Sequence, residues 1–171
     1  MASETLFLAI TVNKSPMTKK AELDSIDLKI LQALQRDGRL SNADIADAVA
    51  LSPSPCLRRL RRLESDDVIQ GYRVQLNRQA IGLGMTVYVQ VKLQDHGIES
   101  VAGFEQALLG MPQVINAHTV SGSADYLLEV VVSDLPDYDR WVRQIQLLRM
   151  VREIESNFAL REVKAQAPLP L

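Results

Sequence analysis

Residues 52–64 read SPSPCLRRLRRLE, a stretch in which arginines are interleaved with leucines. Ser52 followed by Pro53 favours a helix start, because serine caps a helix and proline suits its first position. At about 100° per residue, one arc of this helix carries the apolar side chains Cys56, Leu57, Leu60 and Leu63. The rest of the surface carries the arginines Arg58, Arg59, Arg61 and Arg62. The stretch therefore predicts a helix packed on its leucines, with all four arginines on the solvent side.

Two further helices are predicted before this one. Asp24 and Asp27 have the spacing of a capping box, and the apolar residues after them repeat at about 3.6 residues until Asp37-Gly38 ends the helix. A second helix begins at Ser41, and a tight turn then leads into the third. The β-type residues of 68–76 predict an extended strand. This order is typical of a winged helix-turn-helix, so we expect such a DNA-binding domain with its linker strand over residues 21–83.

The second half alternates between strand and helix patterns. Apolar and polar residues alternate over 86–93, as in a strand with one buried face. The further elements predicted from spacing and turn residues are a helix over 98–108, strands over 114–120 and 126–132, a helix from Pro136 and a strand over 154–163. The order βαββαβ is that of a ferredoxin-like domain, expected over residues 84–171. The fold class is therefore α+β.

Composition narrows the function further. Net charge is −2, but residues 1–83 carry +2 and residues 84–171 carry −4. The single cysteine, Cys56, excludes a disulfide framework and a cysteine-based zinc site, and we expect it to be a small buried apolar residue. The second of two histidines, His118, is expected to be packed or at an interface. We expect no metal site and no cofactor.

The first 20 residues are left as an unassigned tail, with Met17 as an alternative translation start. Their apolar run is short and follows no positive charge, which argues against a signal peptide. No stretch approaches the roughly 18 apolar residues of a membrane span. We therefore expect a cytoplasmic protein with no membrane partner.

The arginine helix suits contact with double-stranded DNA. A guanidinium group can pair with two acceptors on a phosphate or on a guanine edge, and the first residues of such a helix meet base edges. We assign base edges to Ser54, Pro55 and Arg58, and phosphates to Arg59, Arg61 and Arg62. The starts of the second and third helices add Ser41, Asn42 and Ser52, because helix N-termini favour phosphate. The alternative is a solvated charged face without a ligand.

Several motifs resemble the Lrp/AsnC family, also called feast/famine regulators. They are Leu23-Asp24-x-x-Asp27, residues 51–56, Arg61–Glu64, residues 120–128 and the closing Leu169-Pro170-Leu171. The resemblance covers about residues 22–171. It implies a transcription regulator whose C-terminal domain, of the RAM type, forms dimers and often tetramers or octamers. It also implies an amino acid bound at subunit interfaces.

The resemblance places the effector loop at Gly122–Asp125 and aligns Ser156 with a hydroxyl that lines the same pocket. The implied effector-binding set is Gly122, Ser123, Asp125, Tyr126 and Ser156. The Asp125 carboxylate can accept from an ammonium, while N–H groups near Gly122 and the Ser156 hydroxyl can donate to a carboxylate. The alternative is that these residues only form a turn and a strand edge. One departure is Leu148-Arg149-Met150-Val151, where family members usually carry Leu-Pro-Gly-Val; either the turn differs or the helix runs on.

Three functions remain after these observations. The first is a sequence-specific transcriptional regulator whose assembly or DNA affinity responds to a small molecule, expected to be an amino acid. The second is an architectural DNA-binding protein without a ligand. The third is an enzyme, because sirohaem decarboxylases resemble this fold. The chain lacks a nucleophile elbow and an H-E-x-x-H motif, which argues against catalysis.

Overall fold

The chain folds into two compact units. The computed structural model describes residues 21–165 and 167–171, so the predicted tail and Met17 lie outside the described residues. Residues 76–163 form one unit, and residues 21–75 together with 164–171 form the other. The boundary predicted after residue 83 thus lies earlier. The last residues, predicted to belong to the second domain, join the helical unit instead.

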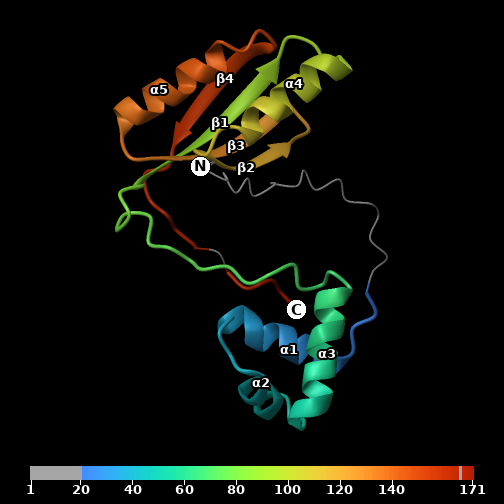
Figure 1. Ribbon diagram of the computed structural model, residues 1–171. Helices are drawn as coiled ribbons and strands as arrows, with labels where there is room; N and C mark the ends of the chain where they lie inside the picture. The colour runs from blue at the N-terminus through green and yellow to red at the C-terminus, as the bar shows by residue number, and fades with distance from the viewer. Residues whose placement is uncertain (1–20, 166) are drawn as a thin grey trace, which may run out of the picture. The chain divides into compact units, whose positions relative to one another are not determined.

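The helical unit contains the three predicted helices: α1 (Ser25–Arg36), α2 (Asn42–Ala48) and α3 (Pro53–Ser65) (Figure 1). Local capping explains where they begin. The side chains of Asp24 and Asp27 cap α1 reciprocally, and those of Ser41 and Asp44 do the same for α2. Each box satisfies backbone N–H groups that a helix start leaves without partners.

The three helices enclose a small apolar core. Its fully or nearly fully buried residues are Ile30, Leu31, Ile45, Ala46, Val49, Cys56 and Leu63. Cys56 is buried as predicted, and burial raises the pKa of its thiol. Leu60 packs against this core as predicted, although it is half-buried, and Leu57 is half-buried as well.

The strand predicted after α3 does not form within the described chain. Residues 71–77 run as extended chain, and the large side chains of Tyr72, Val74 and Leu76 remain exposed. A strand needs a neighbour to satisfy its backbone, and the described residues of one protomer offer this segment none. The strand predicted from the β-type residues is therefore wrong for the described chain, in which Val68 and Ile69 instead bend back and donate to the Leu63 carbonyl.

The closing segment of the chain contacts α1. The Gln35 Oε1 accepts a hydrogen bond from the Leu169 N–H. The Gln35 Nε2 donates to the Leu169 carbonyl oxygen at 3.4 Å. The amide of Gln32 donates to the carbonyl oxygen of Leu171 at 2.9 Å. These hydrogen bonds attach residues 169–171 to α1 within the helical unit.

The second unit is a ferredoxin-like four-stranded antiparallel sheet with two helices, as predicted. Its elements in chain order are β1 (Met85–Leu93), α4 (Ile98–Leu109), β2 (Val114–Thr119), β3 (Tyr126–Val132), α5 (Leu135–Gln146) and β4 (Val151–Phe158). The strand order across the sheet is β2-β3-β1-β4 (Figure 1). The two middle strands, β1 and β3, are therefore the ones with neighbours on both sides.

One face of the sheet forms the core with the two helices. Alternate residues of β1, from Val87 to Leu93, are buried as the sequence pattern predicted. They pack with Phe104 of α4 and with Trp141 and Ile145 of α5. In the described chain, the opposite face of the sheet carries no helix.

The last strand differs from its prediction at both ends. α5 stops at Gln146, and residues 147–150 make a turn in which the Val151 N–H donates to the Leu148 carbonyl. The sequence that replaces Leu-Pro-Gly-Val thus forms a turn rather than a longer helix, and the strand begins earlier than residue 154. It ends at Phe158, opposite Val87, and the last hydrogen bond to its neighbour β1 runs from the Ala159 N–H to the Thr86 carbonyl, so residues toward 163 have no partner strand in the described chain.

No described helix is both long and apolar enough to cross a membrane.

We expect Leu128→Ala to lower the free energy of unfolding of the sheet unit by about 2–5 kcal/mol, because this β3 side chain is fully buried. Fluorescence of Trp141, the single tryptophan of the chain, follows unfolding of this unit in denaturant. The matched control is Leu147→Ala at an exposed position, which should change the value by less than about 0.5 kcal/mol. Equal effects of the two substitutions would contradict the assigned core.

Candidate DNA-binding surface and effector loop

The unpaired polar surface of α3 is narrower than predicted. It is a stripe formed by Ser54, Arg58 and Arg61. Ser54, Arg58 and Arg61 are exposed and lie four and three residues apart, so they share one face of the helix. Neither arginine has an ion-pair partner among the described residues. Pro55, also assigned to DNA, is half-buried beside this stripe.

Arg59 and Arg62 lie on a different face and pair with α1. The Nη1 of Arg59 donates to the Asp24 Oδ2 at 2.6 Å and to the Asp27 Oδ1 at 2.9 Å. The Nη2 of Arg62 donates to the Asp27 Oδ2. The expectation that all four arginines face solvent is therefore wrong for Arg59, whose side chain is 26% exposed. Arg62, at 46%, is exposed but paired.

The acceptors of these bonds sit in the first turn of α1. Asp27 is the one buried charged residue of the described chain, with 0% exposure. Asp24 is half-exposed, and the pKa of its carboxyl is lowered to about 2, first because it accepts the Asp27 N–H and next because it pairs with Arg59. The ion pair with Arg59 is therefore present above pH 4 and is lost only as the pH falls through about 2.

Three residues assigned to DNA, Ser41, Asn42 and Ser52, lie at the starts of α2 and α3. The Ser41 hydroxyl donates to Asp44 in the capping box of α2, and that contact lowers the pKa of Asp44. The Asn42 amide donates to the Pro53 carbonyl at 2.9 Å and so ties the start of α2 to the start of α3. Ser52 is the N-cap residue of α3, but its exposed hydroxyl makes no capping bond.

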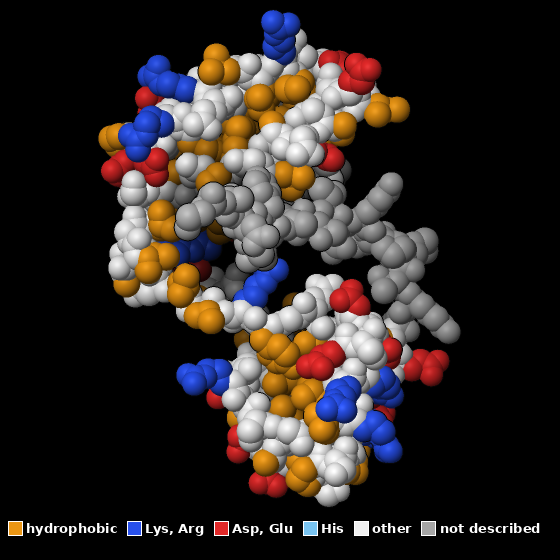
Figure 2. Space-filling model, viewed as in Figure 1, with side chains coloured by type: hydrophobic (Ala, Val, Ile, Leu, Met, Phe, Trp, Pro, Cys, Tyr) orange, Lys and Arg blue, Asp and Glu red, His pale blue; other side chains and the backbone are white. Residues whose placement is uncertain are grey.

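The face of the helical unit turned to the viewer in Figure 2 shows Lys and Arg side chains close to Asp and Glu side chains. This surface is mixed in charge and not a continuous basic patch. Attraction to DNA therefore depends on which arginines remain without an acidic neighbour.

The predicted effector loop closes the end of the sheet between β2 and β3. The Val120 N–H donates to the Asp125 carbonyl, and the Asp125 N–H donates to the Val91 carbonyl, both at 3.0 Å. Gly122 has a φ of +126°, which side chains other than hydrogen rarely tolerate. The loop geometry therefore requires glycine at this position.

The Asp125 carboxylate is already engaged within the protomer. It accepts the Leu93 N–H at 2.7 Å and lies 2.9 Å from the Nε2 of His96 in the loop after β1. The His96 contact is the main cause that lowers the pKa of Asp125, followed by the Leu93 hydrogen bond. The carboxylate thus connects the effector loop to the segment between β1 and α4.

A polar hollow lies beside this loop on the sheet face that lacks helices. It is lined by Gln90, Val91, Lys92, Ser123, Ala124, Glu153 and Glu155. Both charges needed to recognise an amino acid are present, because Lys92 is cationic and the two glutamates are anionic.

Of the five predicted effector residues, Ser123 lines this hollow, Gly122 and Asp125 belong to the adjoining loop, and Ser156 and Tyr126 lie on the other face of the sheet. Ser156 pairs in register with buried Val89, and its hydroxyl contacts the hydroxyl of Tyr138 on α5, so it faces the helices. Tyr126 is buried on that same side and donates to Glu105 at 3.0 Å; burial and this carboxylate raise the pKa of Tyr126 to about 12. One protomer therefore divides the predicted set between the two faces of the sheet.

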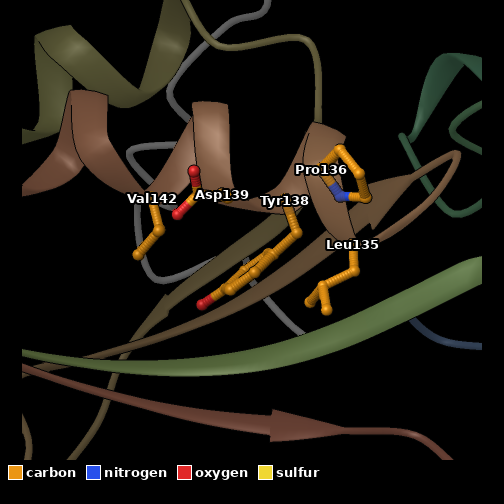
Figure 3. A pocket seen from close by; sticks show the side chains of 5 residues that line it. All are labelled: Leu135, Pro136, Tyr138, Asp139 and Val142. Atoms are coloured by element: carbon orange, nitrogen blue, oxygen red, sulfur yellow. The ribbon is translucent and has the colours of Figure 1, made fainter.

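A second hollow lies on α5, lined by Leu135, Pro136, Tyr138, Asp139 and Val142. Figure 3 shows Tyr138 reaching from the helix toward the strands, with Leu135 beside it. Its one charged group, Asp139, is paired with Arg143. This mainly apolar hollow lacks a cation for a carboxylate, so it fits an amino acid less well than the polar hollow does.

Both halves of the chain match known domain families. Residues 23–70 match a winged helix-turn-helix DNA-binding domain, and residues 86–169 match the Lrp/AsnC ligand binding domain. The chain is 43% identical over 152 residues to the Bkd operon transcriptional regulator of Pseudomonas aeruginosa, which covers 88% of this chain and 99% of that relative. The chain belongs to the Lrp/AsnC family.

Solved structures of Lrp/AsnC relatives share the fold. A transcriptional regulator from Neisseria meningitidis, solved as a complex with L-methionine, has a TM-score of 0.84 at 33% identity over 87% of this chain and 97% of that one. The feast or famine regulatory protein of M. tuberculosis, also complexed with L-methionine, has a TM-score of 0.76 at 28% identity over 86% and 100%. This Lrp/AsnC member is a DNA-binding transcriptional regulator and not an enzyme.

Sequence reasoning missed three contacts in this Lrp/AsnC chain. Asp27 was recognised as a capping residue, but not as an ion-pair partner of the arginine helix. A signal was present, because Asp24 and Asp27 are three residues apart, as are Arg59 and Arg62. His96 contacts Asp125, and Tyr138 contacts Ser156. Both contacts join segments that are distant in the sequence, so no local pattern predicts them.

We expect His96→Ala to raise the pKa of Asp125 toward its ordinary value of 3.8, because it removes the main cause of the lowering. Carbon-detected NMR titration of the carboxyl group measures this directly. In the wild type, the stabilisation linked to Asp125 is present above pH 3.8 and is lost as the pH falls through the lowered pKa; in the variant most of it is absent.

The matched control is His118→Ala, because His118 is exposed on β2 and makes no contact with Asp125 in the described chain. This control should leave the Asp125 titration unchanged. A shift of similar size in both variants would show that the His96 contact is not the cause.

Proposed function

We propose that this Lrp/AsnC regulator binds specific DNA sequences through the exposed stripe of α3 and that an amino acid bound near the Gly122–Asp125 loop modulates its DNA affinity or assembly. The observation that supports the DNA contact most directly is the stripe itself. Ser54, Arg58 and Arg61 are exposed on one face, while the opposite side of α3 is packed through Cys56 and Leu63. A helix held from behind in this way can enter a major groove as a rigid element.

Each group of the stripe has a distinct proposed role. Ser54 and Arg58 lie in the first half of α3, the part that meets base edges in helix-turn-helix complexes. Arg58 can pair with the O6 and N7 of guanine. Arg61 lies nearly a turn further along and suits a phosphate. Ser41, Asn42 and Ser52 lie at the starts of α2 and α3, where backbone N–H groups can donate to phosphate.

We further propose that a second copy of the chain covers the sheet face that carries no described helix. Tyr88, which is 43% exposed, and its neighbours Gln90 and Leu127 lie on this face, and paired sheets bury such side chains. A dimer built this way presents two α3 helices to successive major grooves, about 34 Å apart. Oligomers larger than a dimer use further surfaces of the same unit.

The proposed effector class is a free amino acid. Glu153 or Glu155 can accept from the ammonium, and Lys92 with the N–H groups of the loop can donate to the carboxylate. Asp125 supports this site by holding the loop to β1. The L-methionine complexes of two relatives support the same ligand class. The proposed site does not use the side chains of Ser156 and Tyr126, because both face the helices and are engaged there by Tyr138 and Glu105.

We expect Arg58→Ala to weaken binding to the operator by about 1–3 kcal/mol and to relax the preference for it over unrelated DNA. Arg61→Ala should instead weaken both by a similar factor and reduce the slope of log affinity against log salt by about 1.8 for a dimer. Fluorescence anisotropy with operator and scrambled duplexes at several salt concentrations measures both effects. If Arg58→Ala loses affinity equally on both duplexes, Arg58 contacts phosphate and the proposed base contact is wrong.

We expect L-methionine, used as the first probe among the twenty amino acids, to raise the thermal midpoint of unfolding. At one hundred times the dissociation constant, a ligand that binds only the folded state adds about 2.7 kcal/mol. Asp125→Ala should abolish this shift and leave the oligomeric state unchanged, whereas His118→Ala should keep both. If none of the twenty amino acids shifts the midpoint or changes DNA affinity, the ligand-independent architectural function is favoured instead.

A further inference from the structure

The start of α1 and the middle of α3 are joined by one carboxylate. Asp27 Oδ2 accepts the Asp24 N–H at 3.1 Å and also the Nη2 of Arg62, while its Oδ1 accepts the Nη1 of Arg59. The Asp27 side chain is 1% exposed, so these donors replace water completely. We propose that Asp27 is a positioning residue for DNA recognition, which withholds Arg59 and Arg62 from DNA and fixes the face that α3 presents.

The first step of the argument is electrostatic. A buried carboxylate is strongly unfavourable unless it is paired and hydrogen-bonded, so releasing both arginines to DNA phosphates would leave Asp27 unpaired in the interior. Arg59 is held twice, because its Nη1 also meets Asp24. The two aspartates and the two arginines sum to zero charge. The cluster therefore offers no net attraction to a polyanion.

The second step is geometric. Arg59 and Arg62 are about one turn apart on α3, and both bind within the first turn of α1. Two attachments at different heights fix the rotation of α3 about its own axis, which a single contact cannot do. With that rotation fixed, the stripe of Ser54, Arg58 and Arg61 faces outward. Asp27 thereby selects which arginines read DNA.

This inference rests on the proposed DNA-binding role of α3 and goes beyond it. It predicts that α3 contributes two arginines to the DNA contact of each protomer, Arg58 and Arg61, rather than the four that the sequence contains. Sequence preference then depends on a residue that touches no DNA.

The test measures salt dependence and preference in Asp27→Asn, which keeps the shape and can still accept from the Asp24 N–H but loses the charge. Release of Arg62, or of Arg62 and Arg59, should steepen the log–log salt slope of a dimer by about 1.8 to 3.6. Affinity for scrambled DNA should rise, and the ratio of operator to scrambled affinity should fall. A purely structural role would reduce both affinities and leave the slope unchanged.

A triple variant and a double variant serve as matched controls. Asp27→Asn combined with Arg59→Gln and Arg62→Gln leaves Asp24 as the one charged member of the cluster, and it should restore the wild-type slope because neither glutamine can pair with a phosphate as an arginine does. Arg58→Gln combined with Arg61→Gln removes the same number of arginines from the exposed stripe, and it should reduce the slope of a dimer by about 3.6. A slope below that of the wild type in the first of these variants would overturn the inference, because Arg59 and Arg62 would then contact DNA in the native protein.

A measurement on the wild-type chain requires no substitution and covers the case in which Asp27→Asn does not fold. Side-chain guanidinium resonances of nitrogen-15-labelled arginine are followed during titration with operator duplex. The Arg59 and Arg62 resonances should be slow to exchange with water before DNA is added and should stay in place afterwards, while those of Arg58 and Arg61 move.

The outcomes separate the two proposals. Movement of Arg59 and Arg62 together with Arg58 and Arg61 would overturn the positioning role of Asp27 and keep the DNA-binding function. If none of the four resonances moves and the wild-type protein shows no salt-dependent affinity for DNA, the proposed function of α3 fails instead. Slow exchange of Arg59 and Arg62 in the DNA-free protein still reports whether Asp27 holds them.

Discussion

The packing of the helical unit depends on the buried carboxylate of Asp27. Asp27 completes the capping box of α1 and at the same time accepts guanidinium groups of α3, so one carboxylate sets a helix start and a helix packing angle. Because the carboxylate has donors on both oxygens, its burial is compensated. Because Arg59 and Arg62 are paired with Asp27, the arginines of α3 that remain unpaired toward solvent are Arg58 and Arg61. The proposed recognition surface is therefore a consequence of the packing.

Local signals in the sequence predicted most of the fold. The capping residues Asp24 and Ser41, the Ser52-Pro53 start and the alternation of Val87, Val89 and Val91 each determine structure within a few residues, and those elements were found where expected. The errors concern partners far along the chain. A strand pattern after α3 does not reveal whether a neighbouring strand exists. The length of β4 likewise depends on its pairing with β1, which lies far away in the sequence.

The candidate sites follow the same division. The position of α3 and its exposed Arg58 could be predicted from helical spacing. The pairing of Arg59 with α1 spans 32 residues, so the matched spacing of the two aspartates and the two arginines was its one signal in the sequence. In the effector region, the turn at Gly122 was predictable from its glycine. The face on which Ser156 lies depends on register with β1, and that register places it toward Tyr138 and away from the loop.

The pairing of Gln32 and Gln35 with Leu171 and Leu169 makes the helical unit discontinuous in sequence. A fragment cut at the linker after residue 75 would therefore lack a piece of its own surface, and its isolated behaviour would differ from that of the intact protein. The same feature bears on how the protein is handled. An affinity tag or fluorescent fusion attached after Leu171 would emerge beside α1, within the unit proposed to bind DNA, so such appendages are better placed elsewhere on the chain.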